Sequence, residues 1–179
     1  MPAMRVVVME MPSAVCIFDK VWSWHTKVGK TGHESEGMVC SMLLSIIKLG
    51  RDMGQTEPMH VLFDGTAALA AGSVKVRSTA RGKSKHDSAR LTRLDVKLGK
   101  NIAMCIFHDA SDNEKAGDAF LSEAIESFEG KFGAKMEKMK GTFEKIEKSD
   151  GEVMLSTEEY NEFSGFEEAA ETIKKKYEL

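Results

Sequence analysis

The clearest pattern along the chain is two unbroken apolar runs of strand length. One covers Ala14 to Asp19, and the other covers Ala103 to Asp109. A run of β-branched and aromatic residues without a polar face is typical of a strand that is covered on both sides of a sheet. We therefore expect two central strands, each followed in sequence by an amphipathic helix.

The segment directly after the first run alternates in character. Residues Val21 to Val28 place apolar and polar side chains on opposite faces, as a strand with one wet face does. Because no linker separates this segment from Lys20, we expect the two segments to form a hairpin. Thr31 and Glu34 then have the spacing of a capping box, and apolar residues recur at intervals of three and four. This pattern predicts a helix over 36–49 that covers one face of the sheet.

Further strands and one loop are expected in the middle of the chain. Residues 59–64 and 72–77 are strand candidates, and 91–98 with 102–107 predict a second hairpin around a glycine-containing turn. Residues 78–90 are rich in Arg, Lys, Ser and Gly and offer only two alanines as apolar content. Such a segment cannot bury a face, so a loop is expected there.

The last third of the chain is helical in pattern. Apolar residues over 114–132 trace one clear stripe behind a capping-box spacing. Gly130 and Gly133 are expected to end this helix, and a second stripe over 136–146 predicts a separate helix. A helix start at Ser156 introduces the final helical segment of the chain.

Length and composition favour one domain. The chain has 179 residues and is 42% hydrophobic, enough for a single sizeable core. We expect one domain over 1–179, with a basic loop at 78–90 and a C-terminal helical extension at 149–179. The longest apolar stretch, 38–49, is too short to cross a bilayer, and the N-terminal apolar run is too short for a signal peptide. The expected location is the cytoplasm, at most peripheral to a membrane.

Charge is distributed unevenly along the sequence. The formal net charge is only −3, but residues 75–100 hold nine Lys and Arg against two Asp, whereas residues 109–179 hold 19 Asp and Glu against ten Lys. The basic segment lacks the interleaved aromatic residues that stack on bases, so phosphate head groups or an acidic protein surface are favoured over nucleic acid. The candidate residues for partner or anion binding are Lys75, Arg77, Arg81, Lys83, Lys85, Arg90 and Arg93.

Two tryptophans form a second candidate surface. Trp22 and Trp24 are two positions apart, so in a strand they point to the same face. If the helix over 36–49 covers that face, they belong to the core. If it does not, they are an aromatic anchor for a partner, a role in which Trp is over-represented.

Motifs for chemistry are weak. Gly29, Lys30 and Thr31 resemble the end of a phosphate-binding loop, but the glycine that must come five residues earlier is Trp24, so a plain turn is favoured. The histidines are scattered without metal-ligand spacing. His108 and the following aspartate could suit acid–base chemistry at a strand end, although a carboxylate just before a helix more often stabilises the helix N-terminus.

The cysteines also give no signal for chemistry. All three, Cys16, Cys40 and Cys105, lie inside apolar patterns, which favours reduced, buried thiols over nucleophiles, and Cys16 and Cys105 are expected to be inaccessible. No catalytic residue, cofactor or metal ligand is predicted.

The order of elements resembles the longin and roadblock superfamily of profilin-like (SNARE-like) folds. Residues 16–20, the helix 36–49, the strand 102–109 and the stretch 120–133 carry the likeness, which extends to small longin subunits of vesicle-tethering complexes of the TRAPP type. It implies an α/β (α+β) fold: a longin-like α-β-α sandwich with a five-stranded, mainly antiparallel sheet. One helix would lie on one face and the C-terminal helices on the other, with the first and last strands adjacent in the sheet centre.

The resemblance implies a non-enzymatic protein–protein interaction module acting in small-GTPase regulation or membrane trafficking. Its partner would be another longin or roadblock domain or a small GTPase, in a homo- or heterodimer, with an anionic membrane surface as a further contact. The alternatives are a ligand- or redox-sensing cytoplasmic domain and a small enzyme. Fold alone does not decide between them.

Overall fold

The protein is a three-layer α+β sandwich built around one antiparallel sheet. The computed structural model describes residues 4–23, 34–52, 54, 59–63, 92–109, 114–149 and 155–179. The strands are β1 (Met4–Glu10), β2 (Cys16–Ser23), β3 (Met59–Phe63), β4 (Thr92–Leu98) and β5 (Ile102–Asp109). The helices are α1 (Glu34–Asp52), α3 (Glu114–Lys148), α4 (Thr157–Asn161) and α5 (Phe166–Lys176).

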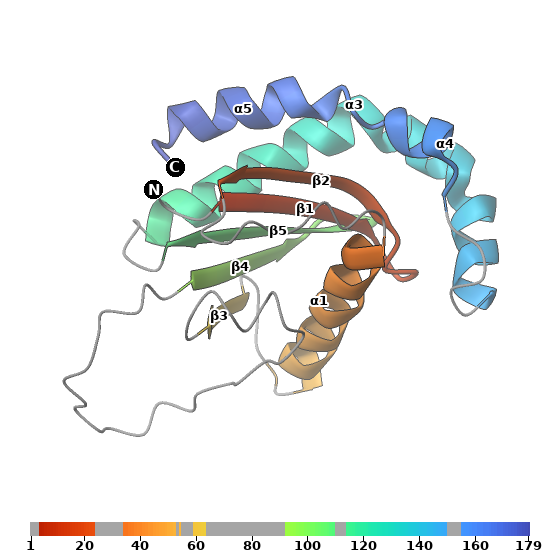
Figure 1. The fold of residues 1–179 in the computed structure, drawn as a ribbon, viewed down its shortest axis with the longest axis horizontal. Coiled ribbons are helices and arrows are strands. Elements are labelled where there is room, and N and C mark those ends of the chain that lie inside the picture. The colour runs from red at the N-terminus through yellow and green to blue at the C-terminus, as the bar shows by residue number, and fades with distance from the viewer. Residues whose placement is uncertain are drawn as a thin grey trace.

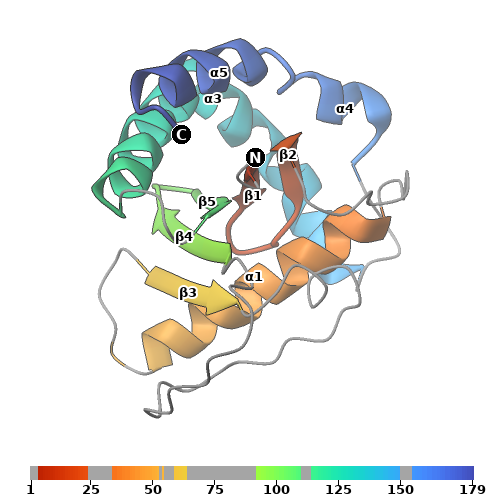
Figure 2. The same cartoon turned by 60° about the vertical axis from the view of Figure 1, so that its left-hand side comes forward.

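The five strands are arranged in the order β2-β1-β5-β4-β3, and every neighbouring pair is antiparallel. Helix α1 lies against one face, and α3 with α5 lies against the other (Figure 1). The expected fold class is therefore confirmed. Figure 2 shows the same layers from a second direction, with α1 below the sheet and α5 beside α3.

The first central strand is β1, in the place predicted for residues 14–19. The run Ala14 to Asp19 is predicted in the centre, but from Cys16 onward it belongs to β2 at the sheet edge. The expected hairpin across Lys20 is also wrong, because β2 continues through this position, and the observed hairpin joins β1 to β2. The turn between them contains a cis bond before Pro12 and a positive φ at Ala14. Neither a Gly nor an Asn marked this turn.

The second central strand was predicted correctly. Every residue of β5 except Asp109 is buried, as a strand covered on both faces requires. It pairs with β1 on one side and with β4 on the other. The first and last strands are thus adjacent in the sheet centre, with β1 in the place where the sequence analysis put residues 14–19. The hairpin of β4 and β5, the strand β3 and the helix α1 also lie where they were expected.

Strand alternation divides the core into two layers. Val6 and Val8 of β1 face α3 and α5, whereas Val7 and Met9 face α1. The α3 layer is aromatic, and its buried rings are Phe18, Phe120, Phe128, Phe132, Phe143, Phe163 and Phe166. The α1 layer is smaller and mainly aliphatic, with Phe107 as its buried ring and with Leu43 and Ile47 of the helix on the sheet.

Helix α3 is a single helix, so the expected break at Gly130 and Gly133 is wrong. A glycine in a helix interior costs about 1 kcal/mol relative to alanine. Phe132 and Met136, which flank Gly133, are buried, and each such side chain contributes about 1.5–3 kcal/mol, which outweighs that cost. With 35 residues, α3 is about 52 Å long. The strands of seven or eight residues are only about 25 Å long, so the distal half of α3 extends past the sheet (Figure 1).

The C-terminal segment returns along α3. Helix α4 begins at the expected helix start, with a capping box in which the Ser156 side chain accepts from the Glu159 backbone and the Glu159 side chain accepts from the Ser156 backbone. Helix α5 packs Phe166 edge-on against Phe18 of β2 and against Phe128 of α3, with centroid distances of 5.1 and 5.0 Å. The extension is therefore part of the main core.

The described residues leave a few of the predictions untested. No helix among them is both long and apolar enough to cross a bilayer. The expectations for 24–28, 72–77 and the loop 78–90 concern residues outside those that the structure describes.

Candidate functional site

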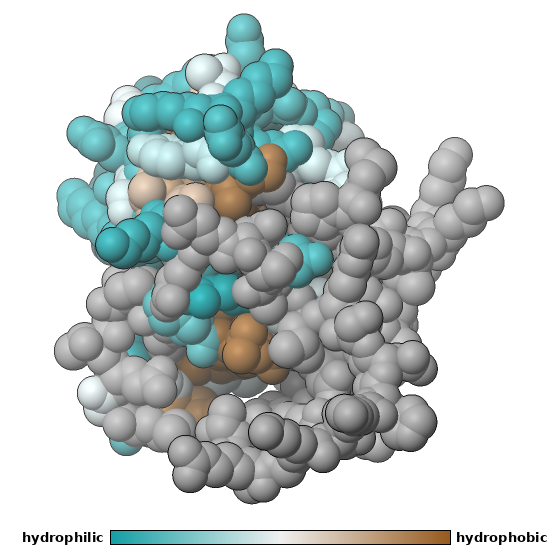
Figure 3. Space-filling view, turned by 90° about the vertical axis from the view of Figure 1, so that its left-hand side faces the viewer, coloured by the Kyte–Doolittle hydropathy of each residue, from teal (hydrophilic) through white to brown (hydrophobic). Residues whose placement is uncertain are grey.

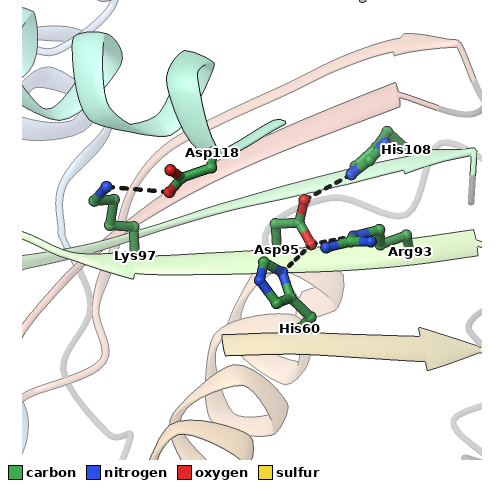
Figure 4. Close-up of polar contacts among 6 residues, drawn as sticks. All are labelled: His60, Arg93, Asp95, Lys97, His108 and Asp118. Carbon is green, nitrogen blue, oxygen red and sulfur yellow. Dashed lines mark hydrogen bonds and ion pairs between the residues drawn. The ribbon is translucent and has the colours of Figure 1, made fainter. Parts of the chain in front are cut away.

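The most polar site in the described core is centred on Asp95 of β4. Its side chain is fully buried on the α3-facing side of the sheet. The register places His60 of β3 directly opposite Asp95 and His108 of β5 opposite Arg93, so three adjacent strands bring four polar side chains together (Figure 4).

Both oxygens of the Asp95 carboxylate accept hydrogen bonds. Oδ1 lies 2.6 Å from Arg93 Nε and 2.7 Å from His60 Nδ1. Oδ2 lies 2.9 Å from Nε2 of His108, whose side chain is buried. An ionised carboxylate only accepts hydrogen bonds, so each histidine nitrogen that faces it carries the proton.

The electrostatics of the cluster favour the ionised carboxylate. Burial raises the pKa of Asp95, but hydrogen bonds from His108, Arg93 and His60 outweigh it and lower the pKa from 3.8 to about 2. Asp95 is thus negatively charged at neutral pH, and the site is a charge-assisted hydrogen-bond network that links β3, β4 and β5.

Helix α3 closes over this network at a glycine. A Cβ atom at Gly117 would lie 2.5 Å from Asp95 Oδ2 and 3.2 Å from His108 Nε2. Only a residue without a side chain therefore lets the first turn of α3 approach the carboxylate so closely. Beside it, Lys97 of β4 pairs with Asp118 of α3 at 3.1 Å (Figure 4).

The cluster differs from the acid–base pair considered in the sequence analysis. His108 and Asp109 are consecutive in β5, so their side chains point to opposite faces, and His108 contacts Asp95 instead. Asp109 is the last residue of this strand, five positions before α3 begins. The sequence did contain a signal for the cluster, because Arg93, Asp95 and Lys97 alternate with apolar residues and so share one face of β4.

The described side chains do not form a metal site. No group of three or more His, Cys, Asp or Glu among them is placed to hold a metal ion. The two histidines contact different oxygens of one carboxylate. One carboxylate thus joins side chains from β3, β4 and β5.

The candidate basic residues are only partly described. The Arg93 guanidinium donates to the buried carboxylate, and 12% of its side chain is exposed, so its charge is compensated inside the protein. Arg93 therefore belongs to the Asp95 network, and its part in partner or anion binding stays a prediction. The other six lie outside the residues that the structure describes: Lys75, Arg77, Arg81, Lys83, Lys85 and Arg90.

Trp22 is covered from the face opposite to α1. Its ring meets Phe120 of α3 at 6.5 Å, its Nε1 donates to Glu171 of α5 at 2.7 Å, and the Lys174 ammonium lies 5.1 Å from the ring centroid. Of the two alternatives for Trp22, the structure supports packing against the core, but α3 and α5 cover the side chain instead of the helix over 36–49. Trp24 lies outside the described residues.

The three cysteines are free thiols of unequal exposure. Cys40 and Cys105 are buried, whereas Cys16 on the edge strand is half-buried, so its expected inaccessibility is wrong. Burial raises the pKa of the Cys105 thiol well above its ordinary value, which disfavours the reactive thiolate.

Three large apolar side chains are exposed in the described part of the surface. They are Val21 of β2 (48% exposed), Leu49 of α1 (60%) and Leu62 of β3 (50%). Two of these lie on the edge strands. Figure 3 shows the molecule from the side that lies on the left in Figure 1. Hydrophilic residues cover the layer of α3 and α5 at the top, and hydrophobic residues reach the surface below this layer.

Comparison with known proteins adds no relative. No family model matches the chain, and no curated protein or solved structure matches it either. The class of protein that the molecule defines is an antiparallel α+β sandwich with two edge strands and a buried polar cross-link.

Proposed function

We propose that the chain is a non-enzymatic protein–protein interaction module of the longin/roadblock type, acting in small-GTPase regulation or membrane trafficking. The observation that carries the proposal is the sheet order β2-β1-β5-β4-β3. It places the first and last strands together in the centre between two helical layers, which is the arrangement that the resemblance implies. The buried position of the Asp95 network is consistent with a structural role for these polar groups.

The edge strands are the surfaces that suit this function. Among the described strands, β2 and β3 each pair on one side only. An edge strand offers backbone donors and acceptors to a second chain, and an apolar side chain beside them adds buried area. Val21 supplies that side chain on β2, and Leu62 supplies it on β3.

The β2 edge is also held in a defined position. Lys20 pairs with Glu167 of α5, and Trp22 donates to Glu171 one turn further along the same helix. These contacts connect alternate residues of the strand to α5. A preformed edge of this kind loses less conformational entropy when a partner strand is added. We propose β2 as the principal partner-binding edge.

The experiment combines oligomeric state with edge variants. The 19.8 kDa chain is run on size-exclusion chromatography with light scattering, alone and with a panel of longin domains and small GTPases. Val21→Lys places a charge on the β2 edge, while Leu49→Lys makes the same change on α1 and serves as the control. We expect dimer or partner complex to be lost in Val21→Lys and retained in Leu49→Lys. A chain that stays monomeric at high micromolar concentration and binds no panel member refutes the proposal.

The basic segment gives the proposal a second partner surface. We propose that Arg81, Lys83 and Lys85 help to dock an acidic surface, either anionic lipid or protein, and each cation near such a surface contributes about 1 kcal/mol. Liposome flotation and partner pull-down with these three residues changed to Glu test it. Binding should fall, and wild-type binding should weaken steeply as salt is raised. Unchanged binding to every partner at low salt would show that the segment is only a connector.

A further inference from the structure

A groove lies where the distal half of α3 extends past the sheet. A cavity of about 590 Å³ separates the β1–β2 turn from this part of the helix. Met11, Pro12 and Ser13 form one wall, and α3 residues from Met136 to Lys148 form the other. This groove is separate from the two sheet edges, and it does not depend on the function proposed above.

Hydrogen bonds hold the turn side of the groove in place. The Met11 backbone N–H donates to the Asn101 carbonyl at 3.0 Å, which connects the two turns at this end of the sheet. The Asn101 side chain donates to Glu137 Oε1 of α3 at 3.2 Å, and both residues line the cavity. Ser13 donates from its backbone to the buried carboxylate of Glu10 at 3.1 Å. The groove is thus preformed.

The lining combines apolar and acidic groups. Met136 and Phe143 lie at its base, and both are largely buried. Four glutamates and two lysines line it, leaving a formal charge of −2. Within the part of the chain that the structure describes, Glu144 and Glu147 are exposed and make no side-chain hydrogen bond or ion pair. These two carboxylates are available to a cationic occupant.

The length of the groove suits a short extended chain. Lys148 lies twelve residues after Met136 in α3, which corresponds to a length of about 18 Å along the helix axis. An extended segment of about five or six residues spans this distance.

We propose that this groove binds an extended segment of a partner protein in which apolar side chains alternate with Lys or Arg. The apolar side chains would pack on Met11, Met136 and Phe143, and the cations would pair with Glu144 and Glu147. Because these ion pairs are exposed, they contribute modestly to affinity and determine mainly which segment is accepted.

Synthetic peptides test the groove directly. The probes are fluorescein-labelled hexapeptides with two Lys or Arg and two Leu, Phe or Met in every arrangement, together with counterparts that carry Glu in place of the cations. Anisotropy gives the affinity, and methionine-methyl NMR locates the bound peptide. We expect saturable binding of a cationic member, with shifts at Met11 and Met136 and none at Met104 in the sheet core. Saturable binding that shifts only methionines elsewhere, or no saturable binding by any cationic peptide, overturns the proposal.

Charge variants make the test quantitative. Glu144→Lys with Glu147→Lys should weaken binding at least about fivefold, and Lys140→Glu with Lys148→Glu should strengthen it. Glu158→Lys with Glu168→Lys adds the same charge at exposed sites on α4 and α5 and serves as the control. Equal weakening in the control pair would show general attraction to an acidic chain and would refute a groove-specific site. Circular dichroism of each variant excludes misfolding.

Discussion

Gly117→Ala is a substitution that improves helix propensity and should nevertheless destabilise the protein. Its Cβ would lie 2.5 Å from Asp95 Oδ2 and 3.2 Å from His108 Nε2. Overpacking a buried site costs about 1–3 kcal/mol, and a displaced buried hydrogen bond costs about 1–3 kcal/mol more. The higher helix propensity of alanine stabilises the protein by only about 1 kcal/mol. We expect the free energy of unfolding to fall by about 3 kcal/mol.

The assay is equilibrium urea denaturation followed by far-ultraviolet circular dichroism. Gly141→Ala is the matched control, because it lies in the same helix and its Cβ would have nothing within 4 Å. That variant should gain about 0.5–1 kcal/mol. If the clash is with the Asp95 carboxylate, Gly117→Ala should cost less in an Asp95→Ala background. Equal stabilisation by Gly117→Ala and Gly141→Ala would refute the close approach of α3 to the carboxylate.

Three further predictions concern the polar network, α5 and the thiols. Because the pKa of Asp95 is lowered from 3.8 to about 2, its contribution to stability is present above pH 4 and is lost as the pH falls toward 2. The stability difference between wild type and Asp95→Asn should therefore shrink by about 2 kcal/mol over this range, and a constant difference in urea titrations would contradict it. Phe166→Ala should cost about 3–5 kcal/mol and make α5 sensitive to protease, whereas Glu168→Ala at an exposed position of α5 should do neither. In native thiol titration, Cys16 should react first and the other two cysteines only on unfolding, so rapid labelling of a second thiol would show that the described burial is wrong.

The local hydrophobic pattern predicted the helices and strands better than it predicted the position of each strand in the sheet. The helix over 36–49 and the β4–β5 hairpin have strong periodicity and clear turn chemistry, and both were predicted within a few residues. The β1–β2 turn was missed because its positive φ falls on Ala14, which normally avoids that region, and because β1 has only Val6 to Val8 as its apolar run. Once β1 was missed, the neighbouring run was moved from the sheet edge to the centre.

The candidate site was harder to predict because it depends on register. His60 and His108 are far apart in the sequence, and only strand pairing brings both to Asp95. The alternation of Arg93, Asp95 and Lys97 indicated a polar face, but not that this face would be buried under α3. The continuity of α3 through Gly130 could not be predicted locally either, because tertiary burial outweighs the cost of the glycine.

The central position of β1 has a consequence for how the chain folds. Its second neighbour in the sheet is β5, which begins about 90 residues later. Until Ile102 to Asp109 has left the ribosome, one edge of β1 has no partner strand, and the apolar residues on both of its faces lack most of their cover. Such long-range pairing slows folding, and until it forms, the unpaired edge and apolar faces of β1 are prone to aggregation. Synthesis of this protein therefore passes through a stage at which chaperone binding to the β1–β2 hairpin is of most benefit.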